Sequence, residues 1–184
     1  FPAKTMIAAA MNPCKCGFFP DLGKCRCTPT QIRRYLNRVS GPFLDRIDIG
    51  VEVPRQDLGM MAAEKSIDEG SFPQTEQRNS SAVMRARVME ARARQEKRFA
   101  DESISYNSQM TRRQIEEYCR LSGEDAVFLE KVERQQGISA RRHGKILKVA
   151  RTLADLDGQA EIGRTQLAEA IGFRSFEKKY WGRL

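Results

Sequence analysis

Four of the five cysteines lie in one short segment of the chain, as the pairs Cys14-Lys-Cys16 and Cys25-Arg-Cys27. Two glycines and a proline lie between the pairs, so a tight loop is expected. Four thiolates on such a loop can surround one tetrahedral Zn²⁺ at about 2.3 Å each. A single residue inside each pair is less specific than the wider spacing of zinc ribbons. Zinc is therefore the favoured interpretation of the loop, with free thiols and redox disulfides as alternatives.

The composition limits the compartment and the class of partner. The chain has 184 residues, a formal net charge of +8 and a pI near 9.5, which fits nucleic acid or nucleotide phosphates as partners, or a solvated basic surface. No apolar run approaches the roughly 18 residues of a transmembrane helix, and the first residues lack the features of a signal peptide. We therefore expect a cytoplasmic protein without membrane contact, where metal binding is favoured over disulfides. The start, which lacks Met, suggests a piece of a longer protein.

Regular elements are predicted on both sides of the cysteine loop. The apolar run 6–11 predicts a buried strand that ends at Asn12. Thr28 begins a capping-box sequence with proline at the first helical position, which predicts a helix over 28–39. Apolar and polar residues alternate over 47–53, the pattern of a strand with one buried face.

The second half of the sequence predicts helices only. Apolar residues at helical spacing follow Thr111, Ser122 and Ser139, each a good N-cap, and a long Ala-, Arg- and Glu-rich helix precedes them over 76–99. A last helix is expected over about 164–171. The predicted organisation is a strand-containing region over 1–56, a linker over 57–75, an all-α domain over 76–174 and a tail over 175–184, which we expect to be disordered or bound to a partner.

Several polar groups are candidates for a phosphate site. The segment 17–25 superficially resembles a Walker A loop, but it has five residues between its glycines and Cys25 in place of the Mg²⁺-binding Ser or Thr, so we reject it. Arg46 follows a predicted helical turn and precedes a strand. Arg141 lies near the start of the helix capped by Ser139, where the helix dipole favours phosphate. Taken alone, an arginine at either position is more often structural or solvated than functional.

A resemblance to a known protein family suggests roles for these positions. The order of motifs resembles the magnesium-chelatase-like AAA+ ATPases, and within them the bacterial ComM (YifB) group, over residues 2–174. The stretches that carry the resemblance are Ala9-Ala10-Met11-Asn12-Pro13-Cys14, Ser40-Gly41-Pro42, Leu44-Asp45-Arg46-Ile47-Asp48, Ser139-Ala140-Arg141, Ile146-Leu147 and Val149-Ala150-Arg151-Thr152. The cysteine loop resembles a signature of the ComM group that the chelatase motor subunits lack.

The resemblance implies roles in ATP hydrolysis. Asn12 matches sensor 1, which positions the attacking water, and Arg46 matches the arginine finger, which reaches into a neighbouring subunit's nucleotide. Arg141 matches sensor 2 in the helical lid, with Arg142 as a rival for the role. ATP and Mg²⁺ are the implied cofactors of the full-length protein. Because the Walker segments are absent from this chain, the chain alone is expected to be inactive.

The implied fold is an α/β remnant of an AAA+ core followed by an all-α lid, mainly α overall. The implied function of the full-length protein is a homo-hexameric ATP-driven motor acting on DNA, in branch migration during recombination and natural transformation. A chelatase-type subunit that drives metal insertion by a partner, and a non-enzymatic zinc module that binds nucleic acid, are the alternatives. Arginines of the helix 76–99 could line a DNA path or form a solvated face. Cys119 is expected in the core and His143 at the surface.

Overall fold

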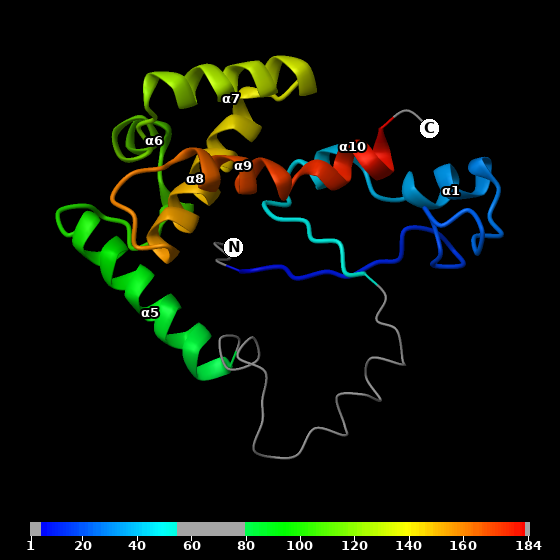
Figure 1. The fold of residues 1–184 in the computed structure, drawn as a ribbon, viewed down its shortest axis with the longest axis horizontal. Coiled ribbons are helices and arrows are strands. Elements are labelled where there is room, and N and C mark those ends of the chain that lie inside the picture. The colour runs from blue at the N-terminus through cyan, green and yellow to red at the C-terminus, as the bar shows by residue number, and fades with distance from the viewer. Residues whose placement is uncertain (1–4, 55–79, 183–184) are drawn as a thin grey trace. The chain divides into compact units, whose positions relative to one another are not determined.

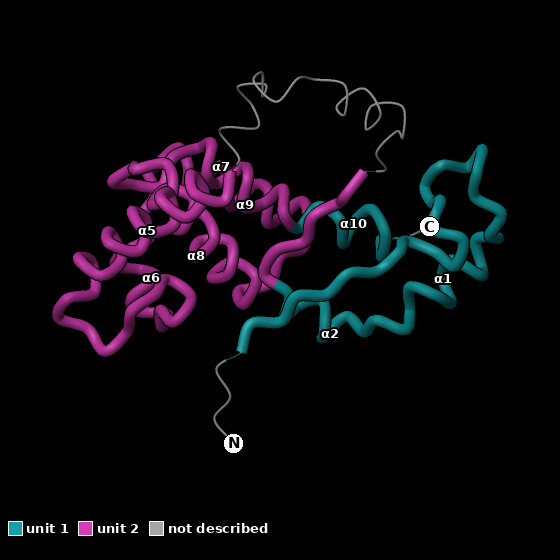
Figure 2. The backbone as a smooth tube through the Cα atoms, turned by 90° about the horizontal axis from the view of Figure 1, so that it is seen from below, with its two compact units in different colours: residues 1–47, 174–184 teal, residues 48–173 magenta. Residues whose placement is uncertain are grey.

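The computed structural model describes residues 5–54 and 80–182. The chain divides into two compact units, one formed by residues 1–47 and 174–184 and the other by residues 48–173 (Figure 2). The predicted linker 57–75 lies outside the described residues.

The first unit contains three helices in its described part: α1 (Pro29–Leu36), α2 (Gly41–Leu44) and α10 (Ser175–Trp181) (Figure 1). The capping box predicted for α1 is present, because the Thr28 hydroxyl accepts from the Gln31 N–H and the Gln31 side chain accepts from the Thr28 N–H. The Ser40 hydroxyl caps α2 by accepting from the Phe43 N–H. Helix α10 corrects the expectation of a disordered tail for residues 175–181, and binding of the tail to a partner stays a prediction.

The two predicted strands are wrong for this structure, because residues 5–54 and 80–182 contain no strand. The segments 6–11 and 47–53 are neither helix nor strand, and apolar side chains on them are open to solvent. Met6 is 94% exposed and Val53 is 87% exposed. A strand exists only when a neighbouring strand accepts its backbone hydrogen bonds. The described residues supply no such neighbour for either segment.

The second unit is all helical in its described part, as the sequence predicts. Its elements are α5 (Ser81–Arg98), η1 (Asn107–Gln109), α6 (Arg112–Tyr118), α7 (Gly123–Gln136), α8 (Ala140–Leu156) and α9 (Arg164–Gly172). The hydroxyls of Thr111, Ser122 and Ser139 cap α6, α7 and α8 through the N–H three residues on, which confirms the three predicted starts. None of the helices in the described ranges is both long and apolar enough to cross a membrane.

Helix α8 is the centre of the second unit. It packs against α5, α6, α9 and η1, and its residues Ile146, Ala150 and Ala154 are almost completely buried. Cys119 is also buried in this core, as the sequence predicts, and burial raises the pKa of its thiol to about 11. Thus α8 presents its apolar stripe to the helices around it and fixes their positions.

A buried ionic cluster joins α5, η1 and α8. The carboxylate of Asp155 has no exposed surface and accepts two hydrogen bonds from Arg98, at 2.8 and 2.5 Å, and one from Asn107 at 2.8 Å. The Arg151 guanidinium lies 3.1 Å from the same carboxylate. Burial acts to raise the pKa of Asp155, but these hydrogen bonds and positive charges outweigh it and hold the pKa below its usual value.

Candidate functional site

The sulfur atoms of Cys14, Cys16, Cys25 and Cys27 all lie within 4.8 Å of one another. The Sγ–Sγ distances are 3.4 Å between Cys14 and Cys16, 3.8 Å between Cys14 and Cys25, and 3.6 Å between Cys16 and Cys25. Disulfide sulfurs would be about 2.05 Å apart, and none of the four cysteines is in a disulfide. Four sulfurs at about 2.3 Å from a tetrahedral zinc lie about 3.8 Å from one another. The spacing therefore fits a four-thiolate metal site.

The backbone of the loop is arranged to support these sulfurs. Gly17 has a φ of +77°, a left-handed conformation that glycine adopts without strain, and its N–H donates to the Cys14 carbonyl at 3.1 Å. The turn directs the next two N–H groups at the sulfurs. The Phe19 N–H donates to Cys14 Sγ at 3.5 Å, and Phe18 donates to Cys16. Hydrogen bonds of this kind orient metal ligands and stabilise thiolate charge.

The thiols of the cluster differ in acidity. The hydrogen bond from the Phe18 backbone is the main reason why the pKa of Cys16 falls to about 6. The Cys27 backbone acts to lower the pKa of Cys25, but burial and the neighbouring sulfurs outweigh it and raise that pKa to about 11. One thiolate therefore forms readily, and its charge opposes the next. A bound cation would remove that opposition, because metal coordination deprotonates thiols.

The cluster is part of a small core. Cys14 is completely buried and packs with Ile32 and Leu36, which are on the inner face of α1. From α10, the Trp181 indole N–H donates to the Leu36 carbonyl at 3.0 Å, and the Tyr180 ring packs edge-on against Phe19 of the cysteine loop. The C-terminal helix therefore covers the loop and α1.

Arg46 lies just after α2, is exposed, and donates to the Pro42 carbonyl at 2.7 Å. The loop that carries Arg46 is held by Arg174, which is buried and only 8% exposed. The Arg174 guanidinium donates to the Ile47 carbonyl at 2.7 Å and to the Leu44 carbonyl at 3.5 Å, one on each side of Arg46. It also pairs with Glu177 of α10. A buried cation thus anchors the backbone on both sides of an exposed one.

The other residues proposed for nucleotide contact lie in different parts of the chain. Asn12 is exposed, two residues before the buried Cys14. Arg141 is exposed in the first turn of α8, whereas Arg142 is half-buried and its backbone N–H donates to the Ser139 hydroxyl at 3.4 Å. The structure therefore brings the four cysteines together, but it does not by itself show a nucleotide site.

Two family models match the chain. Residues 78–174 match the C-terminal domain of magnesium chelatase subunit ChlI, and residues 1–61 match magnesium chelatase subunit ChlI itself. The chain belongs to the magnesium chelatase ChlI family. The resemblance read from the sequence is therefore confirmed.

Curated relatives within this family are similar over nearly all of the chain. It is 40% identical over 95% of its length to competence protein ComM of Haemophilus influenzae, and 39% identical over 97% to the uncharacterized protein YifB of Escherichia coli. An uncharacterized protein of Mycobacterium tuberculosis is 30% identical over 95%. The chain spans about a third of the length of each of these relatives, between 31% and 32%.

Several arginines of α5 have partners within the second unit of this chelatase-family chain. The Arg94 guanidinium donates to the Asp155 carbonyl at 3.0 Å, and Arg98 belongs to the buried ionic cluster. Arg92 lies over the Tyr106 ring, 5.8 Å from its centre. The seven-residue spacing that suggested a DNA path therefore includes arginines with structural contacts.

Two contributors to the site were missed by sequence reasoning. Arg174 anchors the Arg46 loop, and Trp181 closes the cysteine core, although each is more than 120 positions from its partner in sequence. The available signal was the aromatic and basic composition of the tail, which is unusual for a disordered segment. His143, expected at the surface, is half-buried and its Nδ1 lies 2.6 Å from a Glu133 carboxylate oxygen.

Proposed function

We propose that this chain supplies the C-terminal part of an AAA+ ATPase motor that acts on DNA as a ring of six subunits. The observation that carries the proposal is the exposed Arg46 on a loop anchored by buried Arg174, in a chain of the magnesium chelatase family. An arginine that must reach a neighbouring subunit needs an exposed side chain on a fixed base. The region around residue 46 has both properties.

Arg46 is assigned as the arginine finger. Its guanidinium would stabilise the charge that develops on the transferred phosphoryl group, an effect worth about 10³–10⁵ in rate in other nucleotide hydrolases. Asn12 is assigned to the positioning of the attacking water. Arg141, exposed at the N-terminus of α8, is assigned to phosphate contact as sensor 2, with the positive end of the helix dipole adding to its charge.

The remainder of the nucleotide site is assigned to residues outside this chain. ATP and Mg²⁺ require a phosphate-binding loop, and the glycine-containing segment 17–25 instead ends on Cys25, one of the four residues of the cysteine cluster. The chain alone is therefore expected to lack hydrolysis. In an assembled ring, each copy would complete the site of its neighbour.

The cysteine cluster is assigned as a structural zinc site. Its four ligand atoms leave no position open for a substrate, which is the arrangement of structural rather than catalytic zinc. The metal would supply folding free energy to the first unit and take no part in hydrolysis.

The DNA part of the proposal rests on the relatives and on charge. The Haemophilus relative is named a competence protein, and the chain carries a net charge of +8. We infer a role in branch migration during recombination of incoming DNA. The competing hypothesis is a chelatase-type motor that remodels a metal-inserting partner. This hypothesis predicts that DNA has no effect on ATP hydrolysis.

The test uses the full-length protein and measures ATP hydrolysis with and without DNA. We expect DNA to stimulate hydrolysis, and Arg46→Ala to reduce turnover by about 10³-fold or more while ATP binding is retained. Arg120→Ala, which removes another exposed arginine, is the control and should behave as wild type. Normal hydrolysis by Arg46→Ala would refute the finger assignment, and a hydrolysis rate indifferent to DNA would refute the DNA motor.

A further inference from the structure

The positive charge of the chain is unevenly distributed. The described part of the first unit, residues 5–47 and 174–182, has ten Lys and Arg against three Asp and Glu. The described part of the second unit, residues 48–54 and 80–173, has seventeen against sixteen and is nearly neutral. Almost all of the net positive charge of the described residues therefore belongs to the smaller unit. A uniformly solvated basic surface would not produce this division.

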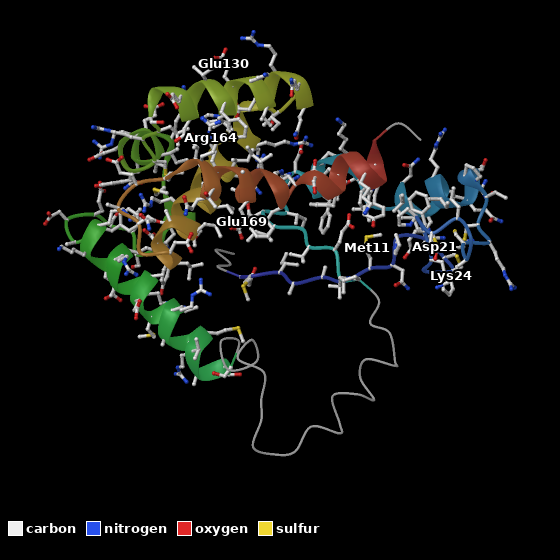
Figure 3. The ribbon with its side chains drawn as sticks, viewed as in Figure 1. Met11, Asp21, Lys24, Glu130, Arg164 and Glu169 are labelled. Atoms are coloured by element: carbon white, nitrogen blue, oxygen red, sulfur yellow. The ribbon has the colours of Figure 1, made fainter. Side chains whose placement is uncertain are left out.

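Within the first unit, the charge is concentrated in residues 14–38, which we call the cysteine module. Its one acidic residue, Asp21, lies 3.9 Å from the Lys24 ammonium on the surface of the loop (Figure 3). Its basic residues are all exposed and are Lys15, Lys24, Arg26, Arg33, Arg34 and Arg38. Four thiolates around Zn²⁺ would carry a net charge of about −2, so the zinc-loaded module would remain positive.

The buried and the basic residues of the α1 region lie on different sides of the helix. Ile32 and Leu36 are buried, and at 100° per residue the three arginines of the α1 region, at 33, 34 and 38, cover the arc opposite them. The helix contains no acidic residue. Its outer surface is thus a continuous positive face on a rigid element.

The cysteine loop adds an aromatic ring to this surface. Phe18, Lys24 and Arg26 line one open depression of about 510 Å³, together with Cys16 and Gly23. Proteins that hold single-stranded nucleic acid combine cations for the phosphates with aromatic rings on which bases stack. A depression with a half-exposed ring and two cations has both components.

We propose that the cysteine module is the surface through which the protein holds the phosphate backbone of single-stranded DNA. The proposal rests on the proposed action on DNA and locates it on this module. The contacts that Arg92, Arg94 and Arg98 make within the second unit argue against a path along α5. The basic side chains track the phosphates, and Phe18 offers a stacking face for a base.

The test compares two triple variants of the full-length protein with the same change in charge. The module variant is Lys24→Gln, Arg26→Gln and Arg34→Gln. The control variant is Arg112→Gln, Arg113→Gln and Arg120→Gln, which neutralises exposed arginines on and just after α6. Binding of a fluorescent oligo(dT) is measured by anisotropy at several salt concentrations, with zinc content and circular dichroism as checks of folding.

We expect the module variant to bind on the order of tenfold or more weakly, and its salt slope to fall by about two, because each lost contact with a single strand contributes about 0.7. The control should remain within about threefold of wild type. Equal losses in the two variants, or a loss in the control alone, would overturn the placement. A preference of the wild type for duplex over oligo(dT) would overturn the single-strand assignment. If the wild type binds neither DNA, the proposed function itself fails.

A second inference comes from Arg174 and does not depend on the charge distribution. We infer that Arg174 is a positioning residue for Arg46, since it binds the carbonyls of Leu44 and Ile47 on either side of it. Those carbonyls fix the backbone from which the Arg46 side chain projects. A loop freed from this anchor would present the guanidinium in many orientations, and a misplacement of about 1 Å can cost about 10²-fold in rate.

The test measures ATP hydrolysis and ATP binding by full-length Arg174→Met and Arg174→Lys. We expect Arg174→Met to lower kcat by about 10- to 100-fold with ATP affinity and zinc content unchanged, and Arg174→Lys to recover part of the loss because an ammonium can still donate to a carbonyl. In an Arg46→Ala background, Arg174→Met should cause no further loss. An unchanged kcat, or a parallel loss of zinc or ATP binding, would overturn the positioning role. Full hydrolysis by Arg46→Ala would instead refute the finger.

Discussion

The buried ionic cluster allows a quantitative prediction about the second unit. Replacement of Asp155 by Asn keeps the size of the side chain but removes its charge. The Arg98 and Arg151 side chains, which are 15% and 3% exposed, would then be buried without an anion between them. Removal of one partner from a buried pair costs about 3–5 kcal/mol. That is a large part of the roughly 5–15 kcal/mol by which domains are stable.

The expected result is a loss of about 3–5 kcal/mol in the free energy of unfolding, measured by urea denaturation. For a unit of the size of residues 48–173, this corresponds to a fall in Tm of roughly 10–20 °C. Glu130→Gln is the matched control. Glu130 lies on the outer side of α7 and pairs with Arg134 at 2.6 Å, but both side chains are mostly exposed, so the loss should be below about 1 kcal/mol (Figure 3).

The reasoning would be refuted by an Asp155→Asn variant within 1 kcal/mol of the wild type. A further variant separates charge from packing. Asp155→Leu combined with Arg98→Met and Arg151→Met replaces the anion and both cations by apolar groups, and exchanges of this kind are often near neutral. We expect the triple variant to be more stable than Asp155→Asn. If the triple variant were less stable than the single one, the cost would lie in shape and not in the unpaired charge.

Three further predictions concern metal, nucleotide and pH. Cys14→Ser should abolish stoichiometric zinc and unfold the first unit, whereas Cys119→Ala should retain zinc, as measured by elemental analysis and circular dichroism. Arg141→Ala should lower ATP turnover of the full-length protein more than Arg142→Ala, because Arg141 is exposed and Arg142 is half-buried. A hydrogen bond from a guanidinium of α9 holds the pKa of Asp125 below its usual 3.8, so its stabilisation is complete above about pH 5 and is lost as the pH falls through the folded-state value. Asp125→Asn should therefore flatten the acid limb of the stability profile measured by urea titration.

The helix starts could be predicted because they depend on neighbouring residues only. Thr28, Thr111, Ser122 and Ser139 each cap an N–H three residues on, and a side chain at that spacing is visible in the sequence. The strands over 6–11 and 47–53 could not be settled in this way, since a strand needs a partner that the local pattern does not name. Where a fold depends on local hydrogen bonds, the sequence was sufficient.

The candidate site shows the same difference between local features, which the sequence predicts, and long-range contacts, which it does not. The cysteine spacing predicted the cluster of four sulfurs, because a short loop leaves few ways to separate them. The anchor of Arg46 could not be found, because Arg174 meets Ile47 across 127 positions and nothing in either local sequence marks the pair. Arg98 and Asp155 are 57 positions apart and were missed for the same reason. Long-range contacts of single polar side chains carry no periodic signal.

The first unit gives a physical reason why a metal and an arginine loop should belong together. Within the described residues, its buried cluster contains Cys14, Ile32 and Leu36, with partly buried cysteines and aromatic rings around them. So few buried apolar side chains cannot offset the conformational entropy of a unit of this size, and small units commonly use a metal for that purpose. The same core seats α10, which begins directly after Arg174. A metal that stabilises the core would therefore also stabilise the base on which Arg46 is held.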